Sequence, residues 1–289
     1  MAPETIARAF EQALHLPGAG AGRLEAPRLL QSWPGIVHGG CLVALVDAAA
    51  ARLGRPPGPR RLEGRLTASV PTESALVIEA DHADGTAGLT IWQGRHILTS
   101  GSVAPLDGET PGVHWWGGAG GLTLPMSEDC LACGARNPLG LQVALVFDDE
   151  GVWARVEPRT PWRLHDGQLH PALVPVLLDE VAWWLGALVM KEGGLTNRLA
   201  ISILEADLPA DGVVVAAGRF DRVTRVDRKG AFWRSELALG TTAGKALATA
   251  SIIFRGGPEY SERQMPYFRS RAPLEVFRRM FPSPALRAT

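Results

Sequence analysis

The sequence contains one short pattern twice, and this repetition limits the folds available to the chain. Residues 35–47 and 167–179 each begin with glycine, have histidine three residues later, and place leucine seven and aspartate nine residues after that histidine. The two histidines, His38 and His170, are 132 residues apart in a chain of 289 residues. A repeat at this separation predicts two units of one fold, joined head to tail.

Length and composition fit this prediction. A chain of 289 residues divides into two domains of about 130–150 residues, each large enough for its own core. The hydrophobic fraction of 46% against 20% charged residues excludes a disordered chain. The net charge of −1 creates no overall field that attracts nucleic acid or an anionic membrane, so neither is expected as a partner.

Cysteine content and the first residues indicate a cytoplasmic protein. The sequence has three cysteines, Cys41, Cys130 and Cys133. A low, odd number of cysteines is typical of a reducing compartment. Residues 1–16 contain no unbroken apolar run, so no signal peptide is expected.

The stretch Pro171–Met190 is nearly all apolar and about as long as a membrane span. Its middle carries Asp179 and Glu180, and two carboxylates there would be costly in lipid. We therefore expect a buried helix packed against a sheet.

Each half shows one helix followed by consecutive strands. In the first half a helix over residues 39–53 precedes strands at 62–70, 75–80, 87–93 and 96–103. In the second half a helix over 172–190 precedes strands at 198–206, 212–224, 229–239 and 244–254. One helix for each antiparallel sheet predicts an α+β fold.

Other segments complete this plan. A short helix is expected over residues 4–14, a flexible break at 17–22, and two further strands at 141–147 and 151–157. The glycine-rich segment 105–121 is the expected linker. We predict an N-terminal domain over 1–115, a C-terminal domain over 116–262, and a basic, helical tail over 263–289.

The pattern His38-Gly39-Gly40-x4-Leu45-x-Asp47 resembles the central-helix signature of hotdog-fold thioesterases of the phenylacetic-acid-pathway and 4-hydroxybenzoyl-CoA type. Residues 130–141 resemble a leader that often opens such domains. Because the likeness covers both halves, it implies a double hotdog, in which each antiparallel sheet wraps a central helix. It also implies hydrolysis of an acyl-CoA or acyl carrier protein thioester, with coenzyme A entering only as part of the substrate and no further cofactor.

The residue types suit this chemistry. A helix N-terminus offers unpaired N–H groups, and glycine allows close approach of a ligand, so Gly39 and Gly40 are candidates to hold the oxyanion. A carboxylate would activate water or attack the thioester itself. His38 belongs to the same motif, and we expect both His38 and His170 to hold the preceding loop by hydrogen bonding.

The helix start and the acid of one copy are too far apart to act together. Gly39 and Asp47 are eight residues apart, or about 12 Å along a helix. The resemblance implies that the helix start of one unit faces the acid of the other. Two composite sites follow, Gly39 and Gly40 with Asp179, and Pro171 and Ala172 with Asp47.

The two composite sites are not equivalent. Pro171 stands where the first copy has Gly39, and proline has no N–H to donate to an oxyanion. We therefore predict that the Asp179 site is the working one. Asp47 is either a second catalytic acid or a satisfied buried acid.

Further candidates lie near Asp179 in the sequence. Glu180 is the alternative acid, and Trp183 is a candidate to line an acyl pocket. Thr196 and Asn197 are candidates to orient the water. Cys130 and Cys133 have the spacing of zinc ligands, but no second pair accompanies them, so no metal is expected.

Some alternatives stay open. Six arginines either meet the phosphates of coenzyme A or form a solvated surface: Arg60, Arg61, Arg269, Arg271, Arg278 and Arg279. An enoyl-thioester hydratase or dehydratase is a second hypothesis, although its usual His/Asp motif is not found here. A non-catalytic acyl-thioester-binding protein is a third, and double-hotdog chains are expected to form a homodimer in some cases.

Overall fold

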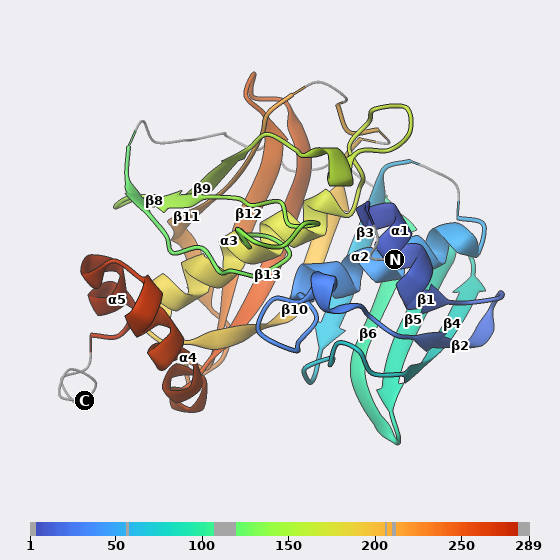
Figure 1. Ribbon diagram of the computed structural model, residues 1–289, viewed down its shortest axis with the longest axis horizontal. Coiled ribbons are helices and arrows are strands. Elements are labelled where there is room, and N and C mark those ends of the chain that lie inside the picture. Colours follow the sequence, from blue (N-terminus) through green and yellow to red (C-terminus); the bar gives the residue numbers. More distant parts are fainter. Residues whose placement is uncertain (1–3, 56–57, 107–119, 206, 210–211, 283–289) are drawn as a thin grey trace.

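In the computed structural model, residues 4–55, 58–106, 120–205, 207–209 and 212–282 are described. Within these residues, thirteen strands form one antiparallel sheet in the order β1-β2-β4-β5-β6-β3-β10-β13-β12-β11-β9-β8-β7. The sheet carries one long helix from each half of the chain, which confirms the predicted α+β class (Figure 1). The predicted boundary between residues 115 and 116 lies outside the described residues.

The first half supplies six strands and the helix α2. The strands are β1 (Leu14–His15), β2 (Gly20–Leu24), β3 (Arg60–Leu66), β4 (Leu76–Ala83), β5 (Thr86–Gln93) and β6 (His96–Pro105). Helix α2 (Gly39–Arg52) packs on β3, β5 and β6, and the short helix α1 (Ile6–Ala13) precedes β1. The turn between β4 and β5 has Asp84 and Gly85 at φ 50° and 74°, as a two-residue hairpin turn requires.

The second half repeats this plan with seven strands and the helix α3. The strands are β7 (Leu122–Thr123), β8 (Leu145–Phe147), β9 (Gly151–Val156), β10 (Gly194–Ile203), β11 (Val214–Arg225), β12 (Phe232–Thr241) and β13 (Ala246–Gly256). Helix α3 (Leu173–Met190) packs on β9 to β13. Two short 3-10 helices, η1 (Arg28–Leu30) and η2 (Thr160–Trp162), lie before α2 and α3 at matching places.

The two halves join through their central strands. β3 pairs antiparallel with β10, with register from Arg65 opposite Arg198 to Arg60 opposite Ile203. This pairing makes one continuous sheet from two repeats. It also places α2 and α3 next to each other, so the helices of the two halves meet directly.

Helix α3 is buried, as its composition predicts. Among the described residues it is the one helix long and apolar enough to cross a membrane, and 78% of that stretch is buried inside the protein. The residue that caps its C-terminus, Lys191, has a left-handed conformation with φ 60°. Burial in the core explains its apolar sequence without a membrane.

Glycine at position 40 allows α2 and α3 to cross closely. A Cβ atom at Gly40 would lie 2.2 Å from the carbonyl oxygen of Pro175 and 2.8 Å from Cα of Val176. These are backbone atoms, which cannot move aside without shifting α3. Only glycine fits at this crossing.

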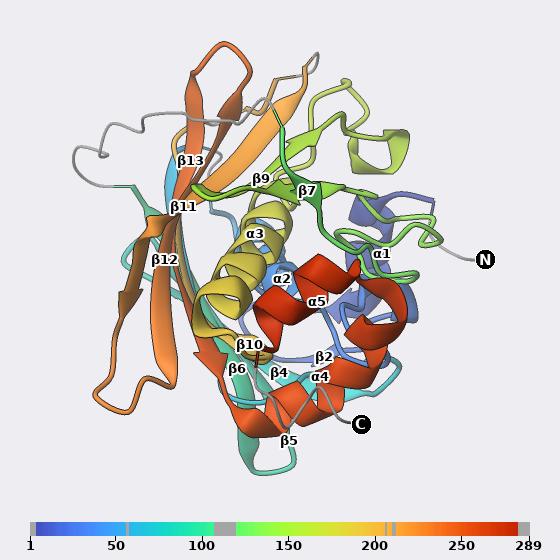
Figure 2. The ribbon, with the colours of Figure 1, turned by 90° about the vertical axis from the view of Figure 1, so that its left-hand side faces the viewer.

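The C-terminal residues form two helices, α4 (Pro258–Arg271) and α5 (Leu274–Met280). Figure 2 shows them on the side of α3 that faces away from the sheet. Phe268 of α4 packs against Trp183 and Trp184 of α3, with ring centroids 5.6 and 5.5 Å apart. The basic segment that begins at residue 263 is therefore partly built into the core, through buried Phe268, Val276 and Met280.

Two local expectations were wrong. Residues 17–22 are not wholly a break, because β2 begins at Gly20 and pairs with β4. The strand expected over 62–70 ends at Leu66, after which Thr67 binds the Leu98 carbonyl. Most of the expected linker, residues 107–119, lies outside the described residues.

The α2–α3 crossing gives a stability prediction. We expect Gly40→Ala to destabilise the protein by about 1–3 kcal/mol, because the new methyl group overpacks against the α3 backbone. Gly18→Ala is the matched control, since a Cβ there meets nothing within 4 Å and the change should stay below about 0.5 kcal/mol. Urea unfolding measures both, and equal stabilities of the two variants would contradict the close crossing.

Candidate active site

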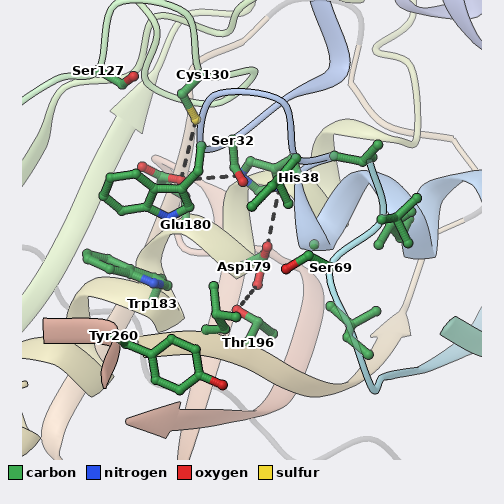
Figure 3. A pocket seen from close by; sticks show the side chains of 18 of the residues that line it. Ser32, His38, Ser69, Ser127, Cys130, Asp179, Glu180, Trp183, Thr196 and Tyr260 are labelled. Atoms are coloured by element: carbon green, nitrogen blue, oxygen red, sulfur yellow. Dashed lines mark hydrogen bonds and ion pairs between the residues drawn. The ribbon is translucent and has the colours of Figure 1, made fainter. Parts of the chain in front are cut away.

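A cavity of about 280 Å³ lies where the start of α2 meets the middle of α3. Its floor includes His38 and Gly39 from the first half and Asp179 from the second. Figure 3 shows Asp179 and Glu180 on opposite sides of His38, with Thr196 next to Asp179. The structure thus brings the predicted helix start and the predicted acid of the other half together.

Two hydrogen bonds hold the Asp179 carboxylate. Its Oδ2 accepts from the Gly40 N–H at 2.7 Å, and its Oδ1 accepts from the Thr196 hydroxyl at 2.6 Å. Only 4% of Asp179 is exposed. Burial raises the pKa of Asp179, against the opposing effects of the His38 charge and of these two hydrogen bonds. Asp179 is therefore a fixed and more basic carboxylate than one in water.

His38 lies between the two acids. Its Nδ1 is 3.3 Å from Asp179 Oδ2, and its Nε2 is 3.2 Å from Glu180 Oε2. Burial alone would lower the pKa of His38, but its interactions with Cys130, Glu180 and Asp179 outweigh burial and raise the pKa well above its usual value. His38 is more than the loop anchor expected from sequence.

The Gly40 N–H lies near two acceptors. It is 3.2 Å from His38 Nδ1 and 2.7 Å from Asp179 Oδ2. We assign it to Asp179, because that bond is shorter and has a charged acceptor. Nδ1 is then able to carry a proton toward Asp179, in agreement with the raised pKa of His38.

The two glycines of the motif have different positions. Gly39 is the first residue of α2 and lines the cavity, and among the described residues no acceptor binds its N–H. Gly40 is buried and its N–H is already bound to Asp179. The geometry therefore favours Gly39 as the oxyanion donor and Gly40 as the group that positions the acid.

Glu180 points away from Asp179 toward a cysteine. Its Oε2 lies 3.9 Å from the Cys130 sulfur, at the limit of a thiol hydrogen bond. The pKa of Cys130 is lowered to about 7, first by a hydrogen bond with Cys133 and further by His38. Both cysteines line the cavity, although sequence reasoning gave them no role in the site.

Thr196, Asn197 and Trp183 all line the cavity. A bulge between Thr196 and Arg198 interrupts the pairing of β10 with β13, as is common beside functional sites. Asn197 donates to the Leu66 carbonyl at 3.1 Å, so its side-chain N–H is bound across the junction of the two halves. Trp183 donates to the Gly194 carbonyl at 2.9 Å and forms an aromatic wall with Phe268.

The second composite site has a different character. Asp47 is bound at both carboxylate oxygens by buried Arg60, at 2.8 and 2.7 Å, and by Arg55 at 3.0 Å. These ion pairs use Asp47 to hold two arginines, and Asp47 is not among the described residues that line the cavity. Together with Pro171, they favour a structural role for Asp47.

His170 repeats the loop contact of His38. The Ala172 N–H donates to His170 Nδ1 at 3.2 Å, the same distance as from Gly40 to His38. Burial lowers the pKa of His170 to about 4, although the Asp47 charge opposes this. His170 is therefore neutral and accepts the backbone hydrogen bond.

The predicted arginine candidates lie elsewhere. None of the six arginines named from sequence is among the described residues that line the cavity. Two other arginines, Arg255 and Arg263, do line it. Arg60 and Arg61 are paired with Asp47 and Glu63. Sequence gave no signal for Arg255 or Arg263, because their positions depend on how β13 and α4 pack beside α3.

No protein-family model matches the sequence, and none of the curated proteins compared with it matches either. Solved structures do match. An acyl-CoA thioesterase II from Mycobacterium marinum has a TM-score of 0.60 at 16% identity, covering 87% of this chain and all of that chain. The chain has the double hotdog fold.

Other solved structures are similar to this chain to nearly the same degree. A tesB protein from Mycobacterium avium subs paratuberculosis has a TM-score of 0.58 at 12% identity, over 86% of this chain and 97% of that one. The dehydratase domain of the polyketide PpsC from Mycobacterium tuberculosis has a TM-score of 0.54 at 15% identity, over 81% and 91%. Identities this low establish the fold only, so function has to be argued from the site.

The neutral state of His170 gives a pH prediction. In the unfolded chain its pKa is close to the ordinary 6.5, and in the folded protein it is about 4. Above pH 6.5 His170 is neutral in both states and does not lower the free energy of unfolding. As the pH falls toward 4, protonation of His170 in the unfolded chain lowers that free energy by up to about 3 kcal/mol.

His170→Asn tests this origin, because asparagine still offers an acceptor to the Ala172 N–H but does not titrate. The free energy of unfolding, measured by urea denaturation between pH 7 and pH 4, should fall less steeply in His170→Asn than in the wild type. Equal slopes would show that His170 is not a source of acid sensitivity.

Proposed function

We propose that the protein is a thioester hydrolase that acts on an acyl-CoA. The observation that carries this proposal is the meeting of Asp179 from one half with the α2 N-terminus of the other, at the floor of one cavity. An activated carboxylate beside a free helix N–H is what hydrolysis of a thioester needs. The similarity of the fold to an acyl-CoA thioesterase II supports the substrate class.

The geometry supports one sequence of events. The thioester carbonyl oxygen accepts from the Gly39 N–H, and the carbonyl carbon then lies toward Asp179. Asp179 takes a proton from water, whose oxygen attacks that carbon. The oxyanion forms at the helix N-terminus, and its collapse breaks the C–S bond. The departing thiolate takes the proton from Asp179 and leaves as the thiol of coenzyme A. Gly40 and Thr196 keep the carboxylate in place throughout.

The cavity walls suit an acyl thioester. Six aromatic side chains line it among the described residues: Trp33, Trp183, Trp184, Tyr260, Tyr267 and Phe268. They offer an apolar surface for an acyl group, and Arg255 and Arg263 offer positive charge for the phosphates of coenzyme A. An acyl carrier protein as the thioester donor, a homodimer and a cytoplasmic location stay predictions.

One observation favours a second function. His38 Nδ1 is 3.3 Å from Asp179 Oδ2, which makes the His/Asp pair that no linear motif displayed. The dehydratase domain among the similar structures was also solved in complex with C12:1-CoA. Hydration of an enoyl thioester is therefore the alternative reaction at the same site.

Substitution of Asp179 tests the proposed function. We expect Asp179→Asn to lower kcat for acyl-CoA hydrolysis by about 10²–10⁴-fold, the usual contribution of a general base or acid. Release of free thiol from a panel of aliphatic and aromatic acyl-CoAs measures this. A variant as fast as the wild type would exclude Asp179 as the base.

Asp47→Asn is the matched control, since it removes the equivalent carboxylate of the other repeat. It should retain kcat per folded molecule, although it leaves buried Arg60 unpaired and lowers stability by about 3–5 kcal/mol. Hydration of crotonyl-CoA without thiol release would favour the hydratase instead. Binding of acyl-CoA without either reaction would favour a binding protein.

A further inference from the structure

Three metal-binding side chains converge at one edge of the cavity. His38 precedes α2, Glu180 lies in α3, and Cys130 lies in the loop that precedes β8. Their ligand atoms all lie within 4.8 Å of one another (Figure 3). We propose that His38, Cys130 and Glu180 bind a zinc ion through Nε2, Sγ and Oε2.

The distances fit tetrahedral zinc. Bonds of about 2.3 Å to sulfur and about 2.0–2.2 Å to nitrogen and oxygen place ligand atoms about 3.3–3.6 Å apart. His38 Nε2 and Glu180 Oε2 are 3.2 Å apart, and Cys130 Sγ and Glu180 Oε2 are 3.9 Å apart. The third separation, between His38 Nε2 and Cys130 Sγ, is at most 4.8 Å, so the side chains would draw together around the ion.

The other ring nitrogen of His38 has the partner that a zinc ligand needs. Histidine ligands almost always donate their second N–H to a carboxylate or carbonyl, which fixes the ring and its tautomer. His38 Nδ1 lies 3.3 Å from Asp179 Oδ2, and Asp179 is itself fixed by Gly40 and Thr196. The ring therefore presents Nε2 toward Cys130 and Glu180.

Glu180 contacts His38 and Cys130 but no guanidinium or ammonium group among the described residues. Its side chain is 12% exposed, and among the described residues no arginine, lysine or backbone N–H donates to it. Asp47, the acid of the other site, is instead bound by two guanidinium groups. A zinc ion with a thiolate, a carboxylate and a neutral imidazole has no net charge, so it suits a buried position.

The proposed site has an open coordination position. His38, Cys130 and Glu180 all line the cavity, so a fourth ligand reaches the ion from the cavity side. Cys133 is outside the set of atoms within 4.8 Å and is not one of the three ligands. Three protein ligands with one open position are typical of catalytic zinc, whereas structural sites are closed.

Zinc binding is tested directly with the metal. The purified full chain is treated with a chelator, loaded with Zn²⁺ and passed through a desalting column, and its zinc is then measured by mass spectrometry. We expect one zinc per chain. Cobalt in place of zinc should give the intense near-ultraviolet absorption of a thiolate ligand. A chain that retains no zinc, or a cobalt complex without that absorption, would overturn the proposal.

Variants identify the ligands. We expect zinc binding to weaken by more than about 100-fold in each of Cys130→Ser, Glu180→Gln and His38→Gln. Loss of a residue that only hydrogen-bonds to a ligand already costs about 10–100-fold in affinity. Cys133→Ser and Cys41→Ser are the matched controls and should bind zinc as the wild type does. Loss of binding in a control would contradict the three-ligand site.

Because these readouts are metal content and a cobalt spectrum, they do not depend on the proposed hydrolysis. The cobalt spectrum of the wild type needs no variant to fold. Zinc binding by a chain that hydrolyses no thioester would support this site and reject the proposed function. Thioester hydrolysis by a chain that binds no zinc would support the proposed function and reject this site.

Discussion

The hydrogen bond from the Gly40 N–H to the Asp179 carboxylate is the contact on which the site depends. It exists only because α2 and α3 cross closely enough for glycine alone to fit beside the Pro175 carbonyl. That crossing in turn requires β3 and β10 to pair, since this pairing brings the two helices together. The position of Asp179 therefore depends on the packing of α2 against α3, and that packing depends on the pairing of β3 with β10.

The two repeats have kept the fold and diverged in chemistry. Both keep a backbone N–H 3.2 Å from Nδ1 of the motif histidine. The second copy has Pro171 in place of a donor, and Asp47 is neutralised by Arg60. A buried acid without a helix N–H is costly unless paired, so the arginine compensates for the proline. As a result, the two halves of a nearly symmetric scaffold carry different chemistry at matching positions.

Much of this was predictable from sequence, because periodic apolar residues and the repeated motif are local signals. They gave both long helices and most of the strands along the chain, and the resemblance to hotdog thioesterases implied the pairing of Gly39 and Gly40 with Asp179. They did not give Cys130 beside His38 and Glu180, since those three residues meet only after the halves pack. Nor did they distinguish Gly39 from Gly40, because which N–H is free depends on the reach of Asp179.

We propose one working site per chain, and the binding stoichiometry of a non-hydrolysable acyl-CoA analogue tests this most directly. Calorimetric titration should give one analogue per chain. Gly39→Ala should abolish binding, because its new methyl group would lie 2.8 Å from Asp179 Oδ2. Two analogues bound per chain would mean that a second site also works. Binding of the analogue to Gly39→Ala would mean that the ligand does not occupy the site of Gly39 and Asp179 alone.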